Sequence, residues 1–119
     1  MKFLRLIVLL FVLMGSCVQI TSRPITEVSQ DELKSVVLVD VRTPEEYAGG
    51  HLENALNINW QDDNFAEQFQ SIGKDETIYV YCKKGGRSIK AQEKLISMGF
   101  ENVVNLEGGY DAVQAPLKN

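Results

Sequence analysis

The sequence predicts an α/β fold: a single domain with a mostly parallel central sheet and helices on both faces of that sheet. Runs rich in β-branched and aromatic residues, such as residues 36–41 and 77–82, alternate along the chain with segments of helical periodicity. This alternation is typical of βαβ units and therefore of a parallel sheet. The length of 119 residues is enough for one small domain.

Two helix starts are visible in the first half of the expected domain. After a brief extended piece, Ser29 precedes a short helical segment and Glu32 follows three positions later, which is the pattern of a capping box. The run 36–41 is apolar at nearly every position, as expected of a strand buried on both faces. Directly after this strand, Thr43 and Glu46 form a second capping box, so another helix is expected to begin there.

The remaining elements follow from the same two periodicities. They are expected in this order: a short strand over 55–59, an amphipathic helix over 62–72, a strand over 77–82, a helix over 88–98, a strand over 102–107 and a final helix after the Gly-Gly pair. Gly99 follows the longest of these helices and is expected to end it.

The first residues differ from the rest and predict an export signal. A short basic segment over 1–5 precedes an unbroken apolar run over 6–14, and two small residues follow. The apolar run is short for a membrane span, so an uncleaved N-terminal anchor is the less favoured alternative. We therefore expect a signal peptide over 1–16, a polar tether over 17–24 and the domain over 25–119.

The end of the signal resembles a lipidation site. The sequence "LMGSC" is similar to the lipobox of bacterial lipoproteins, in which the chain is cut before a cysteine that then carries lipid. Met14 stands where that motif usually has Leu. The resemblance implies that Cys17 is lipidated and that the protein is exported to the periplasm or cell envelope and tied to the membrane. A soluble secreted form is the alternative.

Charge and cysteine content exclude several classes of function. The net charge is −4, and loss of residues 1–16, which contain two basic and no acidic residues, makes it −6. A surface of this sign has no general attraction for nucleic acid. One histidine and two distant cysteines offer no metal-site spacing, so we expect neither a metal nor a cofactor. If Cys17 is lipidated, Cys82 is the only free thiol.

The segment around Cys82 predicts an anion site with a nucleophile. Cys82 ends a strand, at the edge where parallel sheets bind ligands. Gly85 and Gly86 let successive N–H groups turn inward, and the helix that starts near Arg87 and Ser88 directs its positive end to the same place. These features lower a thiol's pKa, so Cys82 is expected to be a thiolate.

Three side chains near this thiol are cationic. Arg87 offers a planar fork for an oxyanion, while Lys83 and Lys84 are point charges that attract anions. Taken alone, Cys82 would more often be a buried packing residue and the lysines merely solvated. The combination of glycines, arginine and helix start favours the functional interpretation.

Two segments resemble the rhodanese-like domain family. "VVLVDVRTPEEYAGGHLENALNI" is similar to the family's N-terminal signature, and "YVYCKKGGRS" is similar to its active-site loop. The sequence "FENVVNLEGGYDA" resembles its usual last strand and turn. The resemblance spans about residues 25–117 and implies a single rhodanese-like domain. Asn54 stands where the family often has Gly, and Val113 where it often has Trp.

The resemblance implies a sulfurtransferase that works through a persulfide. Cys82 would take sulfur from a small anionic donor such as thiosulfate and pass it to a thiol acceptor or reductant. The residues implied to bind the donor and cradle the persulfide are Lys83, Lys84, Gly85, Gly86, Arg87 and Ser88. Asp40, Arg42 and His51 are expected to brace the loops. The size of the chain is compatible with a monomer.

Two other functions stay open at this point. A non-catalytic rhodanese-like binding module usually lacks the cysteine, which this chain retains. Cysteine phosphatases and arsenate reductases have five residues between cysteine and arginine, whereas four separate Cys82 from Arg87. A phosphatase also needs a general acid near the site, and the sequence identifies none.

Overall fold

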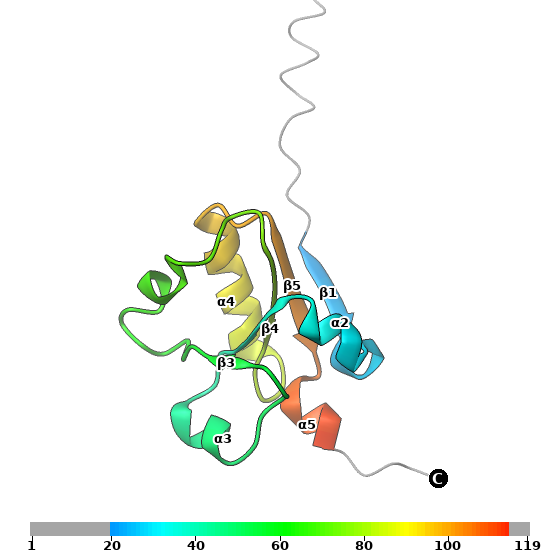
Figure 1. The fold of residues 1–119 in the computed structure, drawn as a ribbon. Coiled ribbons are helices and arrows are strands. Elements are labelled where there is room, and N and C mark those ends of the chain that lie inside the picture. Colours follow the sequence, from blue (N-terminus) through cyan, green and yellow to red (C-terminus); the bar gives the residue numbers. More distant parts are fainter. Residues whose placement is uncertain (1–19, 115–119) are drawn as a thin grey trace, which may run out of the picture.

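A computed structural model describes residues 20–114, which form one α/β domain (Figure 1). The signal peptide expected over 1–16 and the expected lipidation site Cys17 lie outside the described residues. Within residues 20–114, none of the helices has the length and apolar character needed to span a bilayer.

The described part of the chain is built on one five-stranded sheet in the order β1-β5-β4-β2-β3. The strands are β1 (Thr21–Pro24), β2 (Val37–Asp40), β3 (Leu56–Asn57), β4 (Thr77–Tyr81) and β5 (Asn102–Glu107). All four pairings are parallel, which confirms the predicted sheet. The C-terminal ends of the strands therefore meet at one edge.

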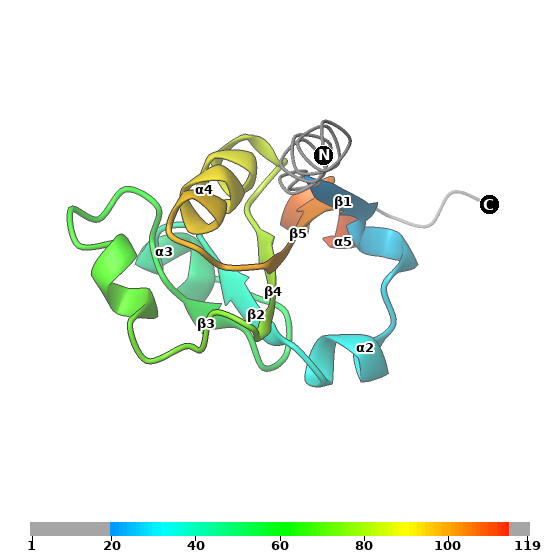
Figure 2. The same ribbon diagram turned by 90° about the horizontal axis from the view of Figure 1, so that it is seen from above.

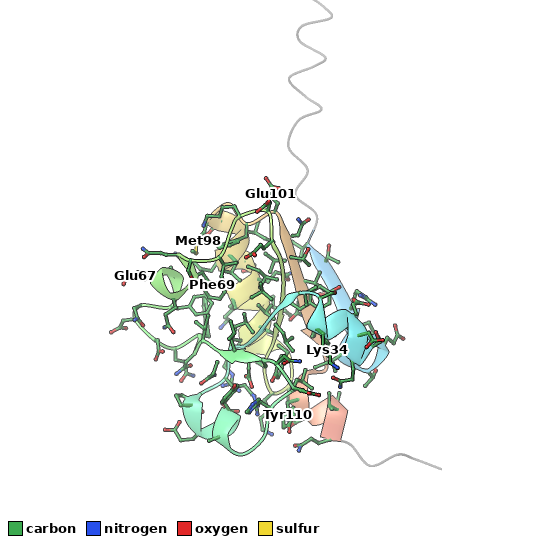
Figure 3. The ribbon with its side chains drawn as sticks, in the orientation of Figure 1. Lys34, Glu67, Phe69, Met98, Glu101 and Tyr110 are labelled. Carbon is green, nitrogen blue, oxygen red and sulfur yellow. The ribbon has the colours of Figure 1, made fainter. Side chains whose placement is uncertain are left out.

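Helices lie on both faces of the sheet, as predicted (Figure 2). They are the 3₁₀ helices η1 (Ile25–Glu27) and η2 (Ala66–Phe69) and the α-helices α2 (Gln30–Lys34), α3 (Pro44–Ala48), α4 (Gly86–Ser97) and α5 (Gly109–Gln114). Helix α4 covers one face together with the segment around η2, while η1, α2 and α5 lie toward the other. Phe69 of η2 is fully buried (Figure 3).

Side chains of β4 alternate between the two faces because successive residues of a strand point to opposite sides. Ile78 and Val80 belong to the core under α4, while Tyr79 and Tyr81 belong to the core on the other face. Cys82 continues the first set and is buried beside it. The alternation thus directs the thiol toward the face that α4 covers.

The predicted tether is wrong over its last residues. Residues 21–24, which we expected to belong to a tether over 17–24, form the edge strand β1 and pair with β5. Gln92 of α4 donates from Nε2 to the carbonyl oxygens of Thr21 (2.7 Å) and Val103 (3.0 Å), and so joins both strands to the helix. Backbone pairing holds β1 in place, and a polar composition does not reveal such pairing.

The helix expected over 62–72 is also wrong in type and length. Only the four residues of η2 are helical within it, and they form a 3₁₀ helix. The apolar residues at helical spacing still face the core: Phe65 and Phe69 are buried, with ring centroids 5.0 Å apart. Packing of these rings is compatible with a shorter and tighter turn than the periodicity predicted.

Capping is confirmed in full at one helix and in half at the other. Thr43 and Glu46 form the complete capping box of α3. Ser29 caps α2 by accepting from the N–H of Glu32 at 3.1 Å. The Glu32 carboxylate instead contacts the side chains of Arg23 and Tyr79, because β1 brings Arg23 beside it.

Candidate active site

Cys82 lies at the C-terminal edge of the sheet, directly after β4 and before α4 (Figure 1). The loop between them turns at Gly85, whose φ of +128° is a backbone conformation that residues with a side chain rarely adopt. Helix α4 begins at Gly86. The first turn of the helix is thereby brought next to the thiol, as the glycine pair predicted.

The Cys82 thiol is surrounded by hydrogen-bonding groups of this loop. The Gly85 N–H donates to Sγ at 3.0 Å, and Sγ lies 3.5 Å from the Ser88 hydroxyl oxygen. The Ser88 hydroxyl in turn donates to the carbonyl oxygen of Gly85 at 3.0 Å. When the thiol loses its proton, the same hydroxyl can rotate and donate to the sulfur.

These contacts favour the thiolate. Burial raises the pKa of the Cys82 thiol, but the Ser88 hydroxyl and the backbone N–H groups of Ser88, Gly85 and Lys84 lower it, and the net direction is downward. The thiol is therefore buried and still easier to ionise than an ordinary cysteine. This combination is that of an activated nucleophile.

The Arg87 guanidinium, predicted to hold an oxyanion, faces a carboxylate. Its two terminal nitrogens donate to the two oxygens of Glu46 at 2.7 and 3.0 Å. Glu46 Oε1 also accepts from the N–H and hydroxyl of Thr43, each at 3.1 Å. The Arg87 guanidinium, together with these Thr43 bonds, lowers the pKa of Glu46 to about 2. The pair joins α3 to the start of α4.

The two loop lysines differ in their surroundings. Lys83 Nζ lies 3.0 Å from the carboxylate of Asp111, and both side chains are largely exposed. Lys84 is exposed and has no ion pair within residues 20–114. Of the three cations that the sequence places at the site, two therefore have acidic partners.

The start of helix α5 hydrogen-bonds to the backbone at Cys82 and Lys83. The N–H of Tyr110 donates to the carbonyl oxygen of Cys82 at 2.8 Å, and that of Asp111 to the carbonyl oxygen of Lys83 at 3.0 Å. Gly109 has a φ of +64°, and a Cβ there would lie 2.4 Å from the Lys83 carbonyl oxygen. Only glycine lets α5 approach this closely.

Asp40 and Arg42 form a buried pair beneath the site. Arg42 donates to the Asp40 carboxylate from Nε and from a terminal nitrogen, the latter at 2.7 Å, and also to the carbonyl oxygen of Gly50 at 2.7 Å. Its guanidinium lies 4.5 Å from the ring centroid of Tyr110, at the lower end of the molecule in Figure 3. These contacts link the end of β2 to the loop after α3 and to α5.

His51 lies at the surface rather than beside the thiol. Its ring stacks on Tyr47, with centroids 3.6 Å apart, and its Nδ1 lies 2.8 Å from the carbonyl oxygen of Tyr47. These contacts join the loop after α3 to Tyr47 of that helix. Within the described residues, no group of three or more potential ligands could hold a metal ion.

Residues 27–116 match the family model of the Rhodanese-like domain. The chain belongs to the rhodanese-like domain family. It is 40% identical over 84 residues to thiosulfate sulfurtransferase 16, chloroplastic, of Arabidopsis thaliana, covering 62% of this chain and 70% of that protein. It is 34% identical over 85 residues to thiosulfate sulfurtransferase GlpE of Shewanella oneidensis, covering 71% and 82%.

A solved structure carries the same fold. A rhodanese-like domain protein from Staphylococcus aureus superposes with a TM-score of 0.70 at 35% identity, covering 84% of this chain and all of that one. The resemblance drawn from the sequence motifs is therefore confirmed at the level of family and fold. This chain is a rhodanese-like domain of the sulfurtransferase family.

Three residues of this rhodanese-like site were missed in the sequence. Glu46 was expected only to cap a helix, and no role was expected for Gly109 or Asp111. The pair Gly108 and Gly109 was a signal for the close approach at Gly109, the first residue of α5, because glycine permits a close backbone approach. No sequence signal joins Asp111 to Lys83, which lie 28 positions apart.

Proposed function

We propose that this protein is a sulfurtransferase that carries sulfur as a Cys82 persulfide. The Cys82 thiolate attacks the outer sulfur of a donor such as thiosulfate, the S–S bond of the donor breaks, and sulfite leaves with its electron pair. The persulfide then gives its outer sulfur to the thiolate of an acceptor, which becomes a persulfide while Cys82 returns to its thiolate. Charge and atoms balance in both steps without an external oxidant.

The observation that carries this proposal is the set of hydrogen-bond donors around the Cys82 sulfur. The Gly85 N–H lies 3.0 Å from Sγ, and backbone N–H groups of the loop lower the pKa of the thiol. These N–H groups stabilise the thiolate before sulfur transfer. After the transfer they can stabilise the negative outer sulfur of the persulfide. The curated relatives named thiosulfate sulfurtransferases support thiosulfate as the first donor to test.

The burial of Cys82 supports a donor with a narrow reacting end. The residue is 1% exposed, so a reactant must bring a single protruding atom to it. The terminal sulfur of thiosulfate fits this requirement. A phosphatase reaction is disfavoured because Glu46, the carboxylate against Arg87, has a pKa lowered to about 2 and holds no proton to donate.

The proposal extends to location and partners. Residues 1–16 and the sequence "LMGSC" support an exported protein held at the cell envelope by lipid on Cys17. Cys82 is then the only thiol of the mature chain, so the acceptor or reductant is the thiol of another molecule. The protein works as a monomer, without metal, cofactor or nucleic acid.

The test is the intact mass of the chain lacking residues 1–17, in which Cys82 is the only cysteine. After incubation with thiosulfate, we expect a gain of one sulfur atom that cyanide or a thiol removes. The Cys82→Ser variant is the control and should gain nothing. If the unmodified thiol remains and is still alkylated by iodoacetamide, thiosulfate is not the donor.

A further inference from the structure

The three loop cations are less available to a donor than the sequence indicates. Arg87 is bound by both oxygens of Glu46, and Lys83 is bound by Asp111. Within the described residues, only Lys84 among the three has no carboxylate partner. The formal charge of the loop and its partners is therefore +1 before the thiolate is counted and zero once Cys82 ionises.

The fold places both acidic partners beside the loop. Glu46 is fixed by Arg87 on one side and by the N–H and hydroxyl of Thr43 on the other. Asp111 follows Tyr110 at the start of α5, and its own N–H bonds the carbonyl oxygen of Lys83 at 3.0 Å. The Glu46 carboxylate is thereby fixed beside Arg87, and the backbone of Asp111 is fixed beside Lys83. Both residues place negative charge next to the cations and oppose the approach of an anion.

We propose that Glu46 and Asp111 set the charge selectivity of the site, so that it accepts monoanionic sulfane-sulfur donors in preference to dianionic ones. The inference rests on the proposed function and deepens it by naming the donor class. When a dianionic donor lies beside the thiolate, the two together carry three negative charges, and the other charges of the loop and its partners sum to +1. With a monoanionic donor there are only two negative charges. The Glu46 and Asp111 carboxylates therefore repel a dianionic donor more strongly than a monoanionic one.

Thiosulfate and methanethiosulfonate form a matched pair of probes. They share the terminal sulfur, but a methyl group replaces one oxygen and removes one charge. With thiosulfate, Cys82 forms the S–S⁻ persulfide and sulfite leaves as a dianion. With methanethiosulfonate, the same S–S bond breaks, the same persulfide forms, and methanesulfinate leaves as a monoanion. Neither reaction needs another reactant.

The decisive quantity is the ratio of kcat/KM for the two donors, measured with cyanide as the common acceptor. The leaving groups differ in reactivity, so the change of this ratio between variants is informative rather than its absolute value. Asp111→Asn frees Lys83 while keeping the backbone bond to the loop. We expect it to raise kcat/KM for thiosulfate roughly two- to fivefold and for methanethiosulfonate by less.

Glu101→Gln is the matched control, because it removes the same charge at the opposite end of the molecule (Figure 3). Its ratio should equal that of the unmodified protein. Glu46→Gln should shift the ratio in the same direction as Asp111→Asn, even if it lowers both rates by loosening the loop. Simple damage to the loop would lower both rates equally and leave the ratio unchanged.

Three outcomes would overturn the inference. The ratio could stay constant in Asp111→Asn and Glu46→Gln, it could shift toward methanethiosulfonate, or Glu101→Gln could shift it as much. In each of these cases sulfur is still transferred, so the proposed function stands. If Cys82 gains sulfur from neither donor, the proposed function fails first and the inference fails with it.

Discussion

At the scale of single residues, Cys82 shows two opposing effects on one thiol. Burial favours the neutral thiol, and the hydrogen bonds from the loop favour the thiolate. The hydrogen bonds prevail because they point at the sulfur from a tight turn that only the left-handed conformation of Gly85 permits. A buried cysteine is therefore not necessarily a packing residue, and its polar neighbours decide which role it has.

The first prediction concerns the pH dependence of Cys82 reactivity. Its pKa is lowered, so the thiolate fraction and the rate of alkylation by iodoacetamide should rise with pH and level off at a lower pH than for free cysteine. Ser88→Ala removes one hydrogen bond to the sulfur, and we expect the midpoint to move to higher pH. Ser97→Ala, at the far end of α4, should leave it in place. An unmoved midpoint in Ser88→Ala would show that Ser88 does not stabilise the thiolate.

The second prediction concerns Glu46 and stability in acid. Its pKa falls from 4.5 to about 2 on folding, so its contribution is complete above pH 4.5 and is lost as the pH falls toward 2. This shift corresponds to at most about 3 kcal/mol of unfolding free energy. Glu46→Gln should therefore reduce stability at pH 7 by about 1–3 kcal/mol and flatten its decline below pH 4.5. Urea unfolding at several pH values measures both quantities.

The control for this experiment is Glu45→Gln, its exposed neighbour in α3. Glu45 has no ion pair within residues 20–114, so we expect its loss to change stability by less than about 0.5 kcal/mol. If the two variants behave alike, the bond between α3 and α4 contributes nothing to stability.

At the scale of elements, α5 decides the shape of the loop that it touches. The third prediction is that Gly109→Ala disturbs the site, because a Cβ there would lie 2.4 Å from the Lys83 carbonyl oxygen. We expect a loss of more than about 2 kcal/mol of stability and at least about tenfold in persulfide formation. Denaturant unfolding and the rate of sulfur gain by mass measure these effects.

Gly99→Ala is the control that tests the effect of a positive φ without a steric clash. Gly99 also has a positive φ, +101°, but a Cβ there would meet nothing within 4 Å. The Gly99→Ala variant should therefore lose only about 1–2 kcal/mol of unfolding free energy and keep its rate of sulfur transfer. Equal effects at the two glycines would mean that close contact with α5 does not shape the site.

The fourth prediction concerns β1, which lies before the domain boundary expected from the sequence. A chain that starts at Ile25 loses β1, uncovers the edge of β5 and leaves Gln92 Nε2 without the Thr21 carbonyl. We expect it to be less stable by about 2 kcal/mol or more than a chain that starts at Ile20. Equal urea midpoints for the two chains would show that β1 does not stabilise the domain and that residues 20–24 act only as a tether.

At the scale of the whole molecule, the direction of the parallel strands places the start of β1 away from the loop after Cys82. Thr21 is level with Val104 and Tyr79. From there the strands run toward the loop between β4 and α4 (Figure 1). Thr21, where β1 begins, therefore lies farther from the loop after Cys82 than Pro24 does. Residues 17–20 span at most about 14 Å. We propose that lipid on Cys17 holds the domain close to the membrane, with the loop after Cys82 directed away from it.

The fifth prediction tests this orientation with the lipidated full chain in vesicles. A fluorophore is placed by Glu101→Cys or by Lys84→Cys, each combined with Cys82→Ser. Lipid headgroups that carry a quencher should quench the fluorophore at position 101 more strongly than the one at position 84. Stronger quenching at position 84 would place the loop at the membrane and contradict the proposed orientation.

Much of the fold could be predicted from local patterns. The strand over 102–107 has the predicted bounds, and α3 begins where Thr43 and Glu46 indicated. Such elements follow from neighbouring residues, which the sequence displays directly. Strand β1 and helix η2 could not be predicted, because one depends on pairing with a strand about 80 positions away and the other on aromatic packing.

The sequence by itself determined the family, the parallel sheet and the glycine-containing loop after Cys82, because each shows in residues that are adjacent along the chain. The tertiary structure alone decided which charges are available at the site. Glu46 reaches Arg87 across 41 positions, and Asp111 reaches Lys83 across 28. Electrostatic attraction depends on distance in space, so the count of cations near Cys82 overstated the positive charge that a donor meets.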